Sequence, residues 1–81
     1  MAKIHGEEIH WIDSFGCGGW HMADDAVETA RHQSPDCVTL GYVYYEDDTR
    51  VAIAQSVGPN GQMMHLSFIP KVAITKRRRA R

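Results

Sequence analysis

Two cysteines and two histidines lie on either side of one short segment, where they could bind zinc. Cys17 and His21 are separated by three residues, and His32 and Cys37 by four. Two thiolates with two imidazoles form a ligand set that structural zinc sites use. The spacing is not an established zinc pattern, however, and cysteine is also a small apolar residue that fills cores. We therefore expect no metal and no other cofactor, and we keep this quartet as the weaker alternative.

The remaining polar residues show no catalytic signature. No serine or cysteine stands in a pattern that pairs a nucleophile with a base, and Gly16-Cys17-Gly18-Gly19 alone is a weak phosphate-binding motif. Glu46, Asp47 and Asp48 are consecutive, whereas a calcium loop spaces its carboxylates alternately. The sequence therefore predicts a binding protein and not an enzyme.

Aromatic side chains offer a candidate binding surface. Those that could stack on bases or on a partner are Trp11, Trp20, Tyr42, Tyr44 and Tyr45. A stacking face normally lies in a positive groove, but Arg50 is the one basic residue between positions 32 and 70. Packing of Trp11, Tyr42 and Tyr44 in the core is the simpler interpretation. The candidates that remain for binding a small nucleotide-like ligand or a host protein are Trp20, His21, Tyr45 and Arg50.

The charges divide the chain into an acidic body and a basic end. Residues 1–70 carry three basic and ten acidic residues, a formal charge of −7, while residues 71–81 carry six basic residues. A basic end attracts polyanions. The candidate nucleic-acid-binding residues are Lys76, Arg77, Arg78, Arg79 and Arg81. We expect residues 77–81 to form a disordered tail, which could grip RNA, DNA or an acidic protein.

Apolar periodicity predicts the elements that position these residues. Period-two alternation indicates strands at residues 7–15, 37–45, 50–57, 62–69 and 72–76. Met22, Ala26 and Ala30 are spaced by four, which predicts a helix over residues 22–32 that ends before Pro35.

The same alternation separates the two faces of each strand. Val38, Leu40, Tyr42 and Tyr44 share one face of the strand over residues 37–45. In the strand over residues 62–69 we expect three side chains to point inward: Met64, Leu66 and Phe68. Three would then remain on its outer face: Met63, His65 and Ile69.

The element order is typical of a small five-stranded antiparallel barrel of the SH3-like or Sm-like kind. The sequence thus predicts a mostly β domain over residues 1–76, with one helix between the first and second strands and a 3₁₀ turn after Pro70. A flat sheet with the helix packed on it is the alternative. No apolar run is long enough to cross a bilayer, and residues 1–6 lack a signal-peptide core, so we expect a cytoplasmic protein.

Several short motifs are spread over residues 8–76. They are Gly19-Trp20-His21, Asp24-Asp25-Ala26, Val38-Thr39-Leu40-Gly41-Tyr42-Val43, Glu46-Asp47-Asp48, Ala54-Gln55-Ser56 and Ile69-Pro70. In these motifs the sequence resembles a family of short, uncharacterised bacteriophage and prophage proteins. The resemblance implies a phage-encoded accessory protein that acts on host machinery or host defence.

A domain of this kind leaves strand edges that can pair with another copy. The candidate edges are the strands over residues 62–69 and 72–76. The basic end of one copy could also lie against Glu46, Asp47 and Asp48 of the next. We therefore expect a homo-oligomer.

Overall fold

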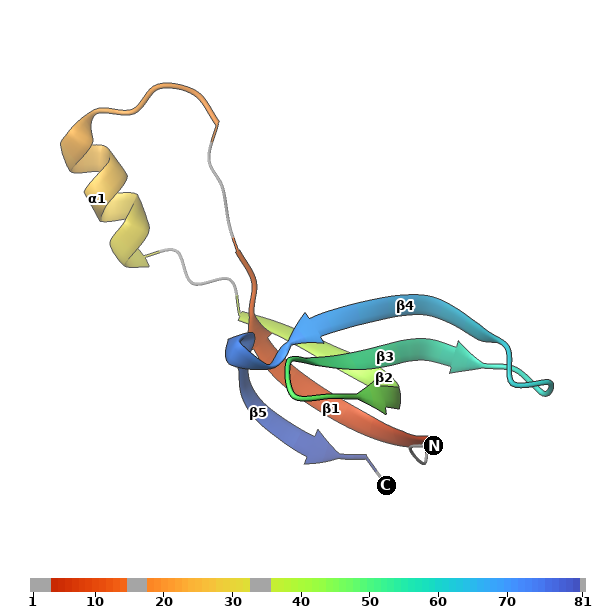
Figure 1. Cartoon of the computed structure of the whole chain (residues 1–81). Helices are drawn as coiled ribbons and strands as arrows, with labels where there is room; N and C mark the ends of the chain where they lie inside the picture. The colour runs from red at the N-terminus through yellow and green to blue at the C-terminus, as the bar shows by residue number, and fades with distance from the viewer. Residues whose placement is uncertain (1–3, 15–17, 33–35, 81) are drawn as a thin grey trace.

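The structure, a computed structural model, describes residues 4–14, 18–32 and 36–80, and in these ranges it contains five strands and one α-helix (Figure 1). In chain order the elements are β1 (His5–Ile12), α1 (Ala23–His32), β2 (Asp36–Glu46), β3 (Arg50–Val57), β4 (Met63–Pro70), a 3₁₀ turn (Lys71–Ala73) and β5 (Ile74–Arg79). The expected mostly β composition, with one helix between the first two strands, is confirmed.

The strands form one antiparallel sheet in the order β4-β3-β2-β1-β5. The sheet is not closed, so the predicted barrel is not confirmed. Its edges are β4 and β5, the two edge strands that the sequence predicts. The prediction of a disordered end is wrong for Arg77, Arg78 and Arg79, which belong to β5. Their backbone pairs with the outer edge of β1, where Arg78 lies opposite Glu8 and Arg77 opposite Ile9. Arg81 lies outside the described residues.

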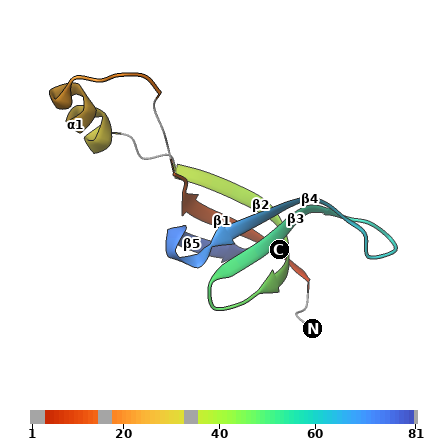
Figure 2. The same ribbon diagram turned by 45° about the horizontal axis from the view of Figure 1, so that its top comes forward.

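The core lies on one face of the sheet. Its buried side chains are Ile9, Val43, Val51, Ile53 and Ile69, with Trp11 and Ile74 packed against them. These residues come from all five strands, so the sheet bends around a single apolar cluster. The opposite face carries no covering layer in the described part of the chain (Figure 2).

The expected orientation of β4 is wrong. Ile69 is buried, whereas Met64, Leu66 and Phe68 are exposed. The pattern of the run itself favours the opposite orientation, because Met64, Leu66 and Phe68 are all apolar whereas the other face includes His65 and Ser67. Pairing with β3 makes the choice, because Ile69 lies opposite the core residue Val51.

Tyr42 is also exposed, contrary to its expected place in the core, and its neighbour Val43 is buried. The pairing of β2 with β3 shifts register between Val43 and Tyr45. Such a bulge changes which side chains point inward on its two sides. Tyr44 is half-buried.

β2 and β3 separate beyond the pair of Tyr42 and Ala54, where their described pairing ends. Gly41 sits at this point of separation. A Cβ there would lie 2.5 Å from the carbonyl oxygen of Ala54 and 3.1 Å from Ile53. The close approach of the two strands therefore requires glycine.

Helix α1 lies away from the sheet in both views (Figures 1 and 2). Ile12 and Asp36 are paired neighbours, so the segment between them leaves and re-enters the sheet at one place. The long dimension of the chain is 53 Å, against 23 and 22 Å across. The alternative of a flat sheet with the helix packed on it is therefore wrong. No helix in the described ranges has the length and apolar character that a membrane crossing needs.

Candidate functional site

Six large apolar side chains share the uncovered side of the sheet, and we call them the apolar face. They are Val38, Leu40 and Tyr42 of β2 with Met64, Leu66 and Phe68 of β4. Cross-strand pairing puts Tyr42, Ala54 and Leu66 in one row, which fixes both sets on the same side. Each side chain of the apolar face is between 44% and 65% exposed. Contiguous apolar area of this kind marks interaction surfaces on soluble domains.

The six side chains of the apolar face lie on either side of β3. That strand carries Ala52 and Ala54 on this side, each 1% exposed. Ala54 lies between Tyr42 and Leu66, and Ala52 lies opposite Phe68. The large side chains beside them therefore cover both alanines, and the side chains of β2 and β4 form the accessible surface.

A cleft of about 320 Å³ opens where β2 and β3 separate. Its lining residues are Val38, Thr39, Leu40, Ile53, Ala54, Gln55, His65 and Ser67. His65 has a φ of +57°, which is uncommon for a residue other than glycine and marks an irregularity in β4. Ile53 with its partner Ser67, and Thr39 opposite Ile9, place much of this lining on the core side of the sheet.

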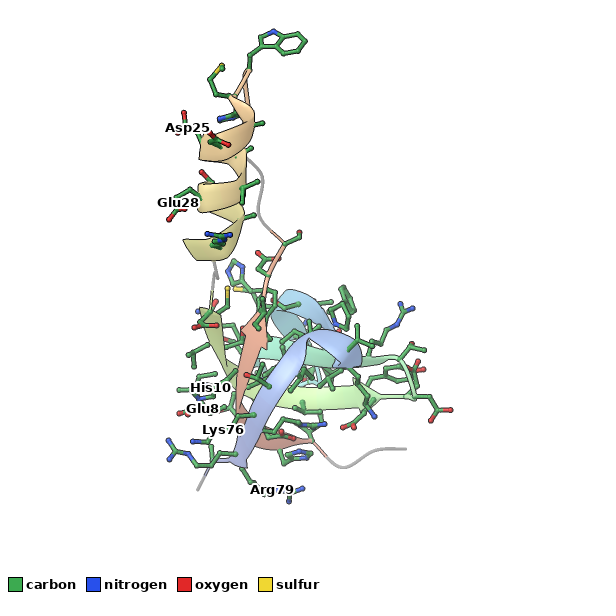
Figure 3. All side chains as sticks on the ribbon, turned by 90° about the vertical axis from the view of Figure 1, so that its left-hand side faces the viewer. Glu8, His10, Asp25, Glu28, Lys76 and Arg79 are labelled. Atoms are coloured by element: carbon green, nitrogen blue, oxygen red, sulfur yellow. The ribbon has the colours of Figure 1, made fainter. Side chains whose placement is uncertain are left out.

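A strip of charged side chains borders the apolar face on the side of β1 and β5. Lys76, His10 and Glu8 lie close together at this border (Figure 3). Lys76 lies opposite His10, which lies opposite Val38, and Arg78 lies opposite Glu8, which lies opposite Leu40. Glu8 accepts hydrogen bonds from His10 Nε2 at 2.6 Å and from Arg78 at 3.1 Å. These bonds lower the pKa of Glu8. Among the described side chains Lys76 has no ion-pair partner, so it is available to an acidic group.

The other, inner side of the sheet carries a charge network built on Arg77. Its Nε and Nη2 donate to the two carboxylate oxygens of Glu7 at 2.7 and 2.8 Å. The same guanidinium donates to Glu46 at 3.0 and 2.9 Å, and Lys71 reaches Glu46 at 2.8 Å. Glu7 is 5% exposed and also bonds His5. The network joins β1, β2, the 3₁₀ turn and β5.

Arg77 and Lys71 thus meet Glu46 within one chain. The contact of the basic end with the acidic turn of another copy stays a prediction. Asp47 has its own partners in that turn, since it accepts hydrogen bonds from Thr49 and Arg50 backbone N–H groups and from Tyr45. These bonds hold the pKa of Asp47 below its usual range.

The Arg77 network predicts a loss of stability in acid. Hydrogen bonds from Arg77 and Lys71 lower the pKa of Glu46 to about 2, and Arg77 lowers the pKa of Glu7. Because both pKa values are lower in the folded than in the unfolded chain, the stabilisation is complete above the unfolded value of 4.5 and is lost as the pH falls toward 2. Urea unfolding at a series of pH values should show this decline, and Glu46→Gln should flatten it. Asp48→Asn, in the same turn, is the control. A Glu46→Gln curve parallel to wild type would contradict the assignment.

The four residues expected to bind a ligand or partner lie in two places. Trp20 is fully exposed before α1, and His21 Nε2 bonds the carbonyl oxygen of Gly18 at 3.1 Å. Tyr45 and Arg50 flank the turn between β2 and β3, where Tyr45 donates to Asp47 at 2.8 Å and its pKa is raised. The structure does not bring the two pairs together.

The sequence pattern did not predict the apolar face, because it places these residues in the core.

Of the zinc quartet, Cys17 and the side chain of His32 lie outside what the structure describes, while His21 precedes α1 and Cys37 is half-buried in β2. Within the described ranges, no three His, Cys, Asp or Glu side chains gather as a metal site would require.

In comparisons with protein-family models, curated proteins and solved structures, nothing matched this chain. Its function is therefore inferred from the arrangement of its own side chains.

Proposed function

We propose that this chain is a non-catalytic binding protein that docks on another protein through its apolar face. The observation that carries the proposal is the set of six large apolar side chains on the uncovered side of the sheet. Lys76 and Arg78 of the charged strip lie at the border of the apolar face. They favour a partner surface that is apolar and carries acidic groups beside its apolar part. This is the chemistry of an amphipathic acidic helix.

The charges favour a protein over a nucleic acid as the partner. Of the five basic residues considered for nucleic-acid binding, Arg77 holds Glu7 and Glu46, and Arg78 holds Glu8. Phosphate contacts would have to compete with these ion pairs. Lys76 and Arg79 form none with the described residues, and two separate cations are a small footprint for a polyanion.

The element order supports the finer fold assignment within this proposal. A helix-containing connection after β1, a meander of β2 to β4 and a 3₁₀ turn before β5 is the order of SH3-like and Sm-like barrels. The resemblance to phage proteins adds the setting, that of an accessory protein in an infected bacterial cell.

A photo-crosslinker at position 68 tests the proposed function. The full chain with p-benzoylphenylalanine in place of Phe68 should form a discrete adduct with a protein in bacterial cells, identified by mass spectrometry. Leu66→Ser in the same chain should abolish the adduct, because Leu66 lies beside Phe68 on the apolar face. The control is the same crosslinker at Val72, which is as apolar and 98% exposed but lies in the 3₁₀ turn.

A protein adduct specific to position 68 supports the proposal. Equal labelling from both positions, or no protein adduct, contradicts it. Adducts with nucleic acid alone, removed by nuclease and weakened by Lys76→Gln with Arg79→Gln, would favour the nucleic-acid alternative instead.

A further inference from the structure

We infer that the apolar face is covered by helix α1 of a second copy of this chain, in a reciprocal dimer. The inference rests on the proposed function and names the partner of the same surface. Each copy supplies one exposed helix and one uncovered sheet face, so two copies related by a two-fold axis satisfy both at once.

Helix α1 requires a partner to be stable. It is ten residues long, and isolated helices of that length are marginal in water because most helical stability comes from packing of an apolar stripe. The stripe consists of Ala23, Ala26, Val27 and Ala30, with Met22 just before it. Val27 is 52% and Met22 75% exposed, so nothing in the described chain covers them.

The side chains of the two surfaces are complementary in size. Three of the four stripe residues are alanines, which allow the helix backbone to approach closely the large, exposed side chains of Leu40 and Leu66. The helix of the same copy points away from its own sheet (Figure 1), so a second copy is the better donor.

The charges match as well. Helix α1 carries Asp24, Asp25 and Glu28 against Arg31. Figure 3 places Asp25 and Glu28 on the separate helix and Lys76 beside His10 on the sheet. β5 is two strands from β2, roughly 10 Å at the usual strand spacing. That distance is about one helix diameter, so a helix lying over β2 brings Asp24 within reach of Lys76.

Sedimentation equilibrium over a concentration series tests the dimer. We expect the full chain to self-associate, and Val27→Asp in the helix or Leu66→Ser in the face each to raise the dissociation constant by about 30-fold or more. Val72→Asp is the matched control and should leave the dissociation constant unchanged. Circular dichroism and urea unfolding verify that each variant is folded.

Mixing the two defective variants identifies the contact. Val27→Asp keeps an intact face and Leu66→Ser keeps an intact helix, so together they should form a heterodimer that neither forms alone. Asp24→Lys and Lys76→Glu should each weaken association, and the double variant should recover it. Association unaffected by Val27→Asp, or folded variants that fail to associate when mixed, would overturn the inference.

Monomeric behaviour over the whole series would overturn it too, including the case in which α1 docks on its own sheet. If the crosslinker at position 68 then captured a different protein, the proposed function would stand and only the second copy would be excluded. If it captured none, both would fail.

Discussion

Ile69→Ala is expected to destabilise the folded chain by about 2–5 kcal/mol, the usual cost of truncating a buried isoleucine. Ile69 is 1% exposed and belongs to the cluster with Val43, Val51 and Ile53. A domain of this size has a total stability of roughly 4–12 kcal/mol, so the loss removes a large part of it. Urea unfolding, followed by circular dichroism at a concentration where the chain is monomeric, measures the change.

Phe68→Ala, one position earlier, is the matched control. Phe68 lies on the opposite side of β4 and is 62% exposed, so its truncation should change the free energy of unfolding by about 0.5 kcal/mol or less. The larger residue should therefore give the smaller effect. The reverse result, a severe Phe68→Ala and a mild Ile69→Ala, would show that β4 packs with its other face inward.

Arg77→Met should be the most damaging single change on the charged side of the sheet. Methionine keeps the apolar stem but leaves Glu7, only 5% exposed, without its bidentate partner and leaves Glu46 with Lys71 alone. Removing one member of a largely buried ion pair costs about 3–5 kcal/mol, and the 29% exposure of the Arg77 side chain places the expected loss near 3 kcal/mol.

Two further variants separate this effect from general loss of charge. Arg79→Met removes a neighbouring arginine that has no ion pair with the described residues, and it should change stability by about 0.5 kcal/mol or less. The double change Glu7→Gln with Arg77→Met should be milder than Arg77→Met alone, because no buried charge is then left unpaired. Equal losses for Arg77→Met and Arg79→Met would show that the network adds no stability.

Local sequence determined the order of the strands and the turns that connect them, while β1 and β5 are displaced from the predicted residues 7–15 and 72–76. Asn60 and Gly61 predict a tight connection between β3 and β4, and Gly61 adopts a φ of +77° there. Pro70 precedes the 3₁₀ turn as expected, because its fixed φ of −62° suits the entry to that turn. These features depend on neighbouring residues alone, so one sequence is sufficient to predict them.

The tertiary structure decided which side of each strand is buried. Alternation defines two faces, and a shift of one residue exchanges them. In Met63–Ile69 the alternation favours Met64, Leu66 and Phe68 as the buried face, but pairing with Val51 and Ile53 of β3 puts Ile69 inside and Phe68 outside. In β2, the pairing of Val43 with Ile53 likewise puts Val43 inside and Tyr42 outside. Likewise, only folding brings Arg77 to Glu7 and Glu46, which are 70 and 31 residues away. These contacts hold the basic end of the chain in a strand. The apolar face follows from the orientation of β2 and β4, because it consists of their large apolar side chains that do not point into the core.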